Sequence, residues 1–240
     1  MVEIYAVKVQ QEFTESEYES FLALVSEEKR EKMRKKHRNN SDINSIIGEV
    51  LARYAIRKRI GIMNSEIHFS YRDHGKPYII GMEQLSFNIS HSGDWVVCAV
   101  GNQEVGIDIE KIKSSRVKVA KRFFTKAEYG DLIEQPEAQQ ATSFCKLWTL
   151  KEAYLKWSGK GLTEPLDSFW FEFGSNNSSP LAEKKQIQLI TDHEHCLKDA
   201  DKLNFRQYKI DNDYELSVCS MEDDFCEEVN IISIRQLEIE

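Results

Sequence analysis

Several features that mark large protein classes are missing from this sequence. No apolar run is long enough to cross a bilayer, and the first residues lack the apolar core of a signal peptide. The five cysteines are odd in number and include no CxxC pair, so neither a disulfide framework nor a paired-cysteine metal site is indicated. We therefore expect a soluble protein of the reducing cytoplasm, with no membrane partner.

An excess of positive charge, a phosphate loop and short repeats are missing too. The net charge of −8 argues against a general nucleic-acid-binding protein, although it leaves room for a local basic site for a small anion. The GxxxxGK[ST] spacing is absent, and no fixed short period indicates a solenoid. The 240 residues, 41% hydrophobic and 30% charged, suffice for one large domain or two packed subdomains.

Hydrophobic periodicity predicts the same order of elements twice. The first half should contain strand 1–9, helices capped by Thr14 and Ser26, and a third helix over 42–59, after a break at 39–42. Strands follow at 67–71, 77–80, 85–90, 95–100 and 105–110, with 91–94 as a turn. Helices at 117–124, 126–133 and 140–158 then precede strands at 170–173, 186–190, 203–210 and 214–219. Residues 174–180 read as a loop.

This doubled order of strand, helices and strands indicates an α+β fold with a seam near 101–106. A Leu-x-Phe segment ending at Phe87, with Trp95 after it, is loosely repeated by one ending at Phe205, with Tyr214 after it. Two similar halves are therefore expected.

Asp108 and Glu110 lie two residues apart in a run rich in β-branched residues. On a strand, both carboxylates leave from one face, and they repel each other unless a cation lies between them. Oxygen ligands at this spacing suit a hard ion such as Mg²⁺. Ile107 and Ile109 predict that the other face is buried. A solvent-facing pair on an edge strand is the alternative for such a pattern taken alone.

Glu152 and Lys156, four residues apart, share one strip of a predicted helix. An exposed ion pair of this kind contributes only about 0.3–0.5 kcal/mol. Here apolar residues occupy most of the helix surface, so Glu152 should be partly buried and need a partner or a raised pKa. The apolar residues are Trp148, Leu150, Ala153, Tyr154, Leu155 and Trp157.

Four further motifs have ordinary structural explanations when taken singly. The Gly75-Lys76-Pro77 tripeptide is typical of a tight turn, and His91 of a turn-stabilising histidine. The basic run over 29–38 fits a solvated helix face. The segment starting at His193, His-Glu-His-Cys, lacks a second ligand pair at zinc spacing.

Taken together, these segments resemble the phosphopantetheinyl transferases of the surfactin-synthetase-activating type. The family pieces are G-K-P, F-N-x-S-H, G-I-D-(I/V)-E, R-F-F-x-x-x-E-Y and W-x-x-K-E-x-x-x-K. They match residues 75–77, 87–91, 106–110, 122–129 and 148–156, in order and at similar separations. The resemblance covers nearly the whole chain and thins after about residue 170.

The resemblance implies two similar α/β halves around a pseudo-twofold axis, with coenzyme A in the cleft between them. The halves would be 1–104 and 105–222, followed by a C-terminal extension at 223–240. It also implies the reaction. The phosphopantetheine arm of coenzyme A moves to a serine hydroxyl of an acyl or peptidyl carrier protein, and adenosine 3′,5′-bisphosphate is released.

The resemblance further implies a role for each site residue. Mg²⁺ would be held by three carboxylates, those of Asp108, Glu110 and Glu152, with Glu110 binding directly or through water. Catalysis would involve Glu152 as base, Lys156 on the departing phosphate, and His91. Coenzyme A contacts would come from Lys29, Lys32, Ser45, Gly75, Lys76, Pro77, Ser90, His91 and Lys156. Carrier contacts are expected over 111–124 and beyond Gly159. A duplicated chain supplies both halves of the cleft, so we expect a monomer serving peptide or polyketide synthetases, as in antibiotic biosynthesis.

One pair departs from the family pattern. Family members often place a basic residue before a hydroxyl residue near the start of the third helix, whereas this chain has Asn44-Ser45. The missing charge weakens the expected grip on the 3′-phosphate unless Lys32 or Arg38 compensates.

Two other functions fit part of the pattern. A magnesium nuclease also uses D-x-E with a lysine, but it usually places that lysine two residues after the acid and should be more basic. A carrier- or coenzyme-A-binding adaptor would have lost a carboxylate or Lys156, and both are intact. The mass of an apo-carrier after incubation with coenzyme A separates these alternatives from a transferase.

Overall fold

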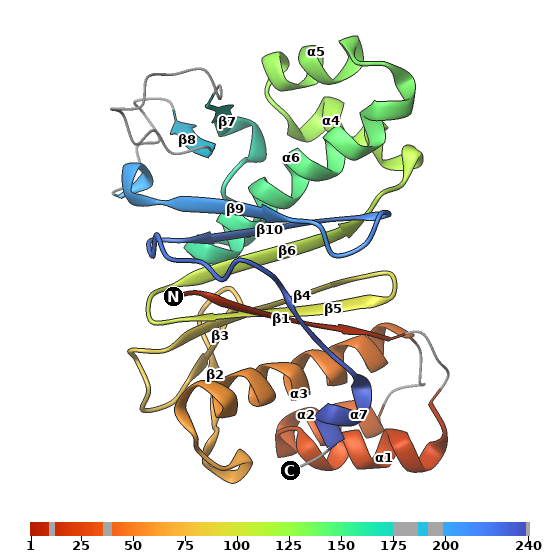
Figure 1. Ribbon diagram of the computed structural model, residues 1–240, viewed down its shortest axis with the longest axis vertical. Coiled ribbons are helices and arrows are strands. Elements are labelled where there is room, and N and C mark those ends of the chain that lie inside the picture. Colours follow the sequence, from red (N-terminus) through yellow and green to blue (C-terminus); the bar gives the residue numbers. More distant parts are fainter. Residues whose placement is uncertain (10–12, 36–39, 175–186, 192–198, 239–240) are drawn as a thin grey trace.

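Four layers, helices on sheet on sheet on helices, make up the molecule (Figure 1). The computed structural model describes residues 1–9, 13–35, 40–174, 187–191 and 199–238. Elements of the first half occupy the lower two layers of the view, and elements of the second half occupy the upper two. None of the helices in the described ranges combines the length and apolarity needed to span a membrane.

Each half begins with a strand, continues with helices and ends with strands. The first half consists of β1 (Glu3–Lys8), α1 (Glu15–Leu24), α2 (Glu27–Arg34), α3 (Asn40–Ile60), β2 (Phe69–Tyr71), β3 (Pro77–Ile79), β4 (Ser86–Ser92) and β5 (Trp95–Gly101). The second consists of β6 (Val105–Lys111), α4 (Val117–Phe123), α5 (Lys126–Glu134), α6 (Glu137–Ser158), β7 (Phe169–Phe173), β8 (Ile187–Thr191), β9 (Asn204–Tyr208) and β10 (Tyr214–Ser220). The chain ends with β11 (Asn230–Ile232) and α7 (Ile234–Glu238).

The two central sheets have the same topology. Strands run β1-β5-β4 in the first half and β6-β10-β9 in the second, and all of these neighbours are antiparallel. Phe87 and Phe205 are each the second residue of equivalent strands, β4 and β9, and Trp95 and Tyr214 each open the strand that follows. The predicted α+β fold of two similar halves is confirmed.

Alternation along β1 and β6 separates two cores. Alternate residues of β1, including Ile4, and of β6, including Ile107, meet in an apolar layer between the two sheets. The opposite face of the β1 sheet packs against α1 and α3, and that of the β6 sheet against α6. Helix α6 and strand β6 are therefore direct neighbours.

Local signals explain where most helices begin and end. The Thr14 hydroxyl accepts a bond from the Glu17 N–H, and the Glu17 carboxylate accepts from the Thr14 N–H, which forms a capping box. Gly159 closes α6 in the left-handed region, at φ 69°, as its sequence position predicts. Ser26 precedes α2 without a side-chain cap, and both its hydroxyl (3.4 Å) and its N–H (2.7 Å) donate to the Glu49 carboxylate instead.

Two local predictions were wrong. The break predicted at 39–42 is misplaced, because α2 ends at Arg34 and α3 already begins at Asn40, while residue 39 lies outside the described residues. The predicted turn at 91–94 is shorter, because β4 continues through His91 to Ser92, which pairs with Trp95. Only Gly93 and Asp94 turn the chain, and Gly93 has φ 56°. His91 is therefore a strand residue.

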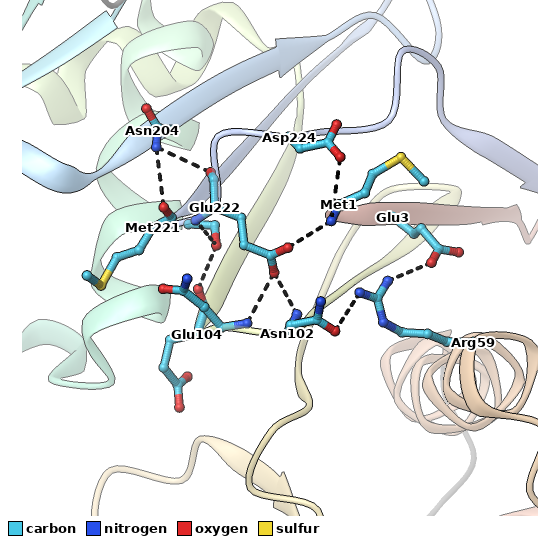
Figure 2. Close-up of polar contacts among 11 residues, drawn as sticks. Met1, Glu3, Arg59, Asn102, Glu104, Asn204, Met221, Glu222 and Asp224 are labelled. Carbon is cyan, nitrogen blue, oxygen red and sulfur yellow. Dashed lines mark hydrogen bonds and ion pairs between the residues drawn. The ribbon is translucent and has the colours of Figure 1, made fainter.

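A polar cluster holds the seam where the chain passes from one sheet to the other (Figure 2). Glu222, after β10, accepts bonds from the backbone N–H groups of Asn102 at 2.6 Å and Gln103 at 3.1 Å. Its other oxygen lies 2.9 Å from the amino group of Met1. One carboxylate thus ties together the first strand, the crossing segment and the last strand of the second sheet.

The C-terminal extension returns to the first half, which the sequence patterns did not predict. β11 pairs in parallel with β1, and α7 contacts α3. The blue C-terminal segment accordingly ends among the helices of the first half in Figure 1.

Candidate active site

The helix-facing side of β6 carries acidic side chains at alternate positions. Asp108 and Glu110 share this face, while Ile107 and Ile109 are buried in the core between the sheets, as predicted. Gly106 belongs to the acidic face as well. A Cβ at Gly106 would lie 2.0 Å from the Ala153 carbonyl oxygen and 2.5 Å from the Trp157 nitrogen of α6. Glycine therefore allows the backbone of α6 to approach β6 closely, and this brings Glu152 and Lys156 to the acidic face.

Strand β4 meets the edge of β6 through side chains. Four alternate side chains of β4 accept hydrogen bonds from alternate backbone N–H groups of β6. The pairs are Ser86 with Val105 (3.3 Å), Asn88 with Ile107 (3.0 Å), Ser90 with Ile109 (3.4 Å) and Ser92 with Lys111 (3.1 Å). We call this set the β4–β6 ladder. It satisfies the N–H groups of an edge strand and joins the two halves at the site.

Asp108 is buried and only partly satisfied. Its Oδ1 accepts bonds from the Ser90 hydroxyl at 2.8 Å and the Lys156 ammonium at 2.6 Å. Its Oδ2 is buried and accepts no hydrogen bond from any described residue. Burial raises the pKa of the Asp108 carboxyl, against the opposing charge of Lys156. A buried carboxylate oxygen without a partner is costly, and a bound cation would satisfy it.

Glu110 lies at the more open end of the same row. Its Oε2 accepts a bond from the Ser92 hydroxyl at 2.8 Å, and its Oε1 pairs with Arg116, from the segment after β6. Both contacts were missed by the sequence analysis. The alternation of polar residues along β4 was the available signal for Ser92, whereas nothing local marked Arg116.

Glu152 extends from α6 toward the same row. Its side chain is partly buried and has no hydrogen-bond or ion-pair partner among the described residues. Burial and then the nearby charge of Asp108 raise the pKa of Glu152 to about 7, and Glu110 adds to this. The charges of Asp108 and Glu110 therefore act on Glu152.

These three carboxylates are not arranged as a complete metal-binding site. Over the described residues, no group of three or more His, Cys, Asp and Glu side chains is arranged to hold a metal ion. Two of the three are instead neutralised by cationic side chains, Asp108 by Lys156 and Glu110 by Arg116. The donor set nevertheless fits a hard divalent cation, because it is all oxygen and includes the unsatisfied Oδ2 of Asp108.

A basic side of the site lies next to the carboxylates. The ring of His91 is exposed, and partial desolvation, followed by the charges of Lys156 and Lys29, lowers its pKa. Lys29 reaches to 3.7 Å from Glu49, and burial lowers the pKa of its ammonium. Lys32 is exposed one turn further along α2. These three cationic or titratable groups form a region suited to an anion.

Lys76 is placed differently from the expectation of a free phosphate contact. Its ammonium is buried and donates to the carbonyl oxygens of Val105 and Trp157, both at 3.0 Å. It also pairs with Glu104 at 2.6 Å. All three of its N–H groups are thus used in joining the turn at Gly75, where φ is 81°, to β6 and α6.

A pocket of about 260 Å³ opens between the two halves beside these groups. It brings together the predicted Gly75-Lys76-Pro77 turn, Glu152 and Lys156. The remaining lining residues are His74, Asn88, Ile89, Leu155, Gly159 and Gly161. His74 and Asn88 are polar lining residues for which the sequence motifs predicted no role.

Asn44 and Ser45 lie on the first turns of α3. The Asn44 amide donates to the Gly93 carbonyl at 3.3 Å, so this residue supports the β4–β5 turn. Ser45 is half-buried. Arg38 and the His-Glu-His-Cys segment lie outside the described residues.

Lys151 is a further residue that the sequence analysis left without a role. It is fully buried, pairs with Glu128 at 3.0 Å and donates to the carbonyl oxygens of Leu166 (2.8 Å) and Phe169 (2.6 Å). It therefore joins α6 to α5 and to the segment before β7. A lysine beside a glutamate in a helix does not reveal such burial.

The molecule is thus a layered α+β protein of two similar halves, with acidic side chains and a lysine at their junction. The model of the 4′-phosphopantetheinyl transferase superfamily matches residues 104–219. That of the 4′-phosphopantetheinyl transferase N-terminal region matches residues 12–104. The chain therefore belongs to the 4′-phosphopantetheinyl transferase family.

Curated relatives agree along the chain. The 4′-phosphopantetheinyl transferase Sfp of Bacillus subtilis is 36% identical over 98% of this chain and 100% of its own length. The transferase psf-1 of Bacillus pumilus is 36% identical over 80% of this chain and 77% of its own. The transferase gsp of Aneurinibacillus migulanus is 38% identical over 72% of each chain. The family inferred from the five motifs is thus confirmed, and the nuclease alternative is set aside.

Proposed function

We propose that this chain transfers the 4′-phosphopantetheine arm of coenzyme A to a serine hydroxyl of an apo acyl or peptidyl carrier protein. One observation carries the proposal. Asp108, Glu110, Glu152 and Lys156 gather where β6 meets α6, beside a pocket between two halves of a chain that belongs to this family. The proposed reaction is that of the family to which the chain belongs. The charged side chains at the site suit the transfer of a phosphate-linked group.

Mg²⁺ is the cation proposed for the carboxylate row. Asp108, Glu110 and Glu152 would hold it, after Lys156 and Arg116 give up their contacts with Asp108 and Glu110. When bound, it would neutralise negative charge on the coenzyme A pyrophosphate and polarise the phosphorus that is attacked. The buried, unsatisfied Oδ2 of Asp108 supports this assignment.

The transfer itself forms one P–O bond and breaks another. The carrier serine oxygen attacks the phosphorus that bears the pantetheine arm, and its proton passes to the Glu152 carboxylate directly or through water. The bond from this phosphorus to the bridging oxygen breaks, and adenosine 3′,5′-bisphosphate leaves with the bond's electron pair. Lys156, already at the site, stabilises the charge on the departing phosphate.

The nucleotide is proposed to lie toward the basic side of the site. His91, Lys29 and Lys32 would face its 3′-phosphate, and Ser90 and Ser45 would contribute hydroxyl groups. Asn44 brings no charge there, and its amide is engaged with Gly93. The Michaelis constants for coenzyme A and its 3′-dephospho form test this arrangement, and equal values would rule out a 3′-phosphate clamp. The Gly75-Lys76-Pro77 turn would shape the pocket wall.

The carrier is proposed to approach the segment that follows β6. Seven lysine or arginine residues and no acidic residue occupy positions 111–127, in a chain whose net charge is −8. Lys118, Lys121, Arg122 and Lys126 are exposed. Such a surface suits an acidic partner and would steer it toward Glu152. Because one chain provides both sides of the pocket, a monomer is proposed to suffice, and peptide or polyketide synthetases of the cytoplasm are the proposed clients.

Intact-mass measurement of a carrier tests the proposal. Apo-carrier, coenzyme A and Mg²⁺ are incubated with the protein, and a gain of one phosphopantetheine arm is expected. Omitting Mg²⁺, with a chelator present, should prevent the gain. An unchanged carrier mass, across several peptidyl and acyl carriers and with coenzyme A bound to the protein, would favour a binding adaptor instead.

A further inference from the structure

One of the four hydrogen-bonded pairs, or rungs, of the β4–β6 ladder differs from the other three. Ser86, Ser90 and Ser92 each accept a β6 N–H bond and also donate their own hydroxyl proton to an acidic side chain. The acceptors are Glu104 at 3.2 Å, Asp108 at 2.8 Å and Glu110 at 2.8 Å. Each of these serines is therefore satisfied both as donor and as acceptor within the protein.

The Asn88 rung has no acid to receive its protons. Its Oδ1 accepts from the Ile107 N–H at 3.0 Å, but the matching position on β6 is Gly106. A side chain cannot be placed at Gly106, because the backbone of α6 occupies the space where its Cβ would lie. The two N–H groups on Asn88 Nδ2 therefore donate to no described residue.

Asn88 is also well placed to meet a ligand. The residue is only 6% exposed, and it lines the 260 Å³ pocket together with Glu152 and Lys156. Two apolar residues that line the same pocket, Ile89 and Leu155, have no side-chain hydrogen-bond acceptor. Among the described residues, the Asn88 amide nitrogen is not one of the fully buried polar atoms that lack a partner, so its N–H groups remain accessible to an acceptor in the pocket.

We propose that Asn88 is a substrate-binding residue whose amide donates to an acceptor oxygen of coenzyme A, either a pyrophosphate oxygen or an amide carbonyl of the pantetheine arm. This inference rests on the proposed function. Asparagine is required at this position for its donors. A serine would still accept the Ile107 N–H bond, but it would offer the ligand at most one O–H donor instead of two N–H donors.

The Asn88→Ser variant isolates this role. Serine accepts β6 N–H bonds at the three other rungs, so the variant should keep the ladder and a melting temperature close to wild type. Calorimetric binding of coenzyme A should weaken about 5- to 50-fold, as for loss of a hydrogen bond to a polar or charged ligand group. Ser86→Ala is the matched control, since it breaks a rung outside the pocket and should leave coenzyme A binding unchanged.

Adenosine 3′,5′-bisphosphate, which lacks the pantetheine arm and one phosphate, identifies the acceptor. If its affinity falls equally in Asn88→Ser, the acceptor is on the shared phosphate. If only coenzyme A weakens, the acceptor lies on the arm or on its phosphate. Unchanged affinity for both ligands overturns the proposal, as does an equal loss in Ser86→Ala, which would mark a structural role. Carrier transfer by the wild type is measured alongside. Its absence would refute the proposed function but not the coenzyme A contact, which the binding data test separately.

Discussion

Strands β1 and β6 hold equivalent places in the two halves, yet they present different chemistry to their helices. Toward the core between the sheets both strands place aliphatic residues, such as Ile4 in β1 and Ile107 in β6. Toward the helices, β1 places Tyr5 and Val7 in an apolar core. At the corresponding positions, two residues apart, β6 places Asp108 and Glu110.

This difference separates residues that stabilise the fold from residues that are proposed to serve catalysis. Tyr5 and Val7 bury apolar surface against the helices, which stabilises the first half. Asp108 leaves its buried Oδ2 unsatisfied, and the charges of Asp108 and Glu110 add to the burial that raises the pKa of Glu152. The second half therefore retains unfavourable electrostatics that a cation and a phosphorylated substrate would relieve.

The largest expected effect comes from removing the charge on Glu152, the carboxylate proposed as the base. Glu152→Gln should lower the rate of carrier modification about 10²- to 10⁴-fold, because the base for the serine proton is lost. Initial rates from intact carrier mass measure it. Glu3→Gln is the matched control on β1, where the acid pairs with Arg59 away from the site, and it should stay near wild type. Rates for Glu152→Gln within about 3-fold of wild type would remove this residue from the chemistry.

Glycine substitutions compare the helix contacts of the two halves. Gly106→Ala should destabilise the fold by about 2–4 kcal/mol, because its Cβ would meet α6 backbone that cannot yield easily. Gly48→Ala on α3 meets side-chain methyl groups alone, those of Ile89 at 3.0 Å and Val96 at 3.7 Å, and gains helix propensity, so the net change should be about 1 kcal/mol or less. Denaturant unfolding measures both. Equal losses would contradict the close approach inferred for α6 and β6.

Two lysines that pair with aspartates test whether burial of the aspartate determines how much the ion pair contributes to stability. Lys156→Met leaves the buried Asp108 without its cation and should lower stability by about 1–3 kcal/mol, less than for a fully buried pair since Lys156 is partly exposed. Lys8→Met breaks a partly exposed pair with Asp211, whose carboxylate is far less buried than that of Asp108, and should have no measurable effect. Thermal melts without divalent ions decide between these. Similar melting temperatures for the two variants would show that Asp108 does not depend on Lys156.

The smallest expected effect is a dependence of stability on pH that arises from the Glu152 carboxyl. The folded-state pKa of Glu152, about 7, lies above its ordinary value near 4.5, so the folded protein binds the proton more tightly. The resulting stabilisation is complete below about pH 4.5 and is lost as pH rises toward 7, by up to about 2 kcal/mol after allowance for partial exposure.

Melts in chelator at pH 5 and pH 8 measure this dependence. Relative to wild type, Glu152→Gln should gain stability at pH 8 but not at pH 5. The same difference at both pH values would show that Glu152 does not titrate in this range.

Much of the site could be predicted from the sequence because its signals are local. The two-residue spacing of Asp108 and Glu110 and the four-residue spacing of Glu152 and Lys156 each place two groups on one face. Arg116 and Lys151 could not be assigned, because their partners lie on other elements. The return of β11 to β1 is likewise a long-range pairing that no local pattern encodes. The wrong turn at His91 arose because strand β4 continues through polar residues that serve β6.

Binding of a divalent ion by Asp108, Glu110 and Glu152 is the single measurement that tests the proposed active site most directly. Electron paramagnetic resonance titration with Mn²⁺, in the presence of coenzyme A, should show one tightly bound ion per chain in the wild type. Asp108→Asn should weaken that binding at least about 10-fold, since one of the three oxygen ligands is lost. Equal Mn²⁺ binding by the two proteins would contradict the assignment of the β6 carboxylates to a catalytic metal.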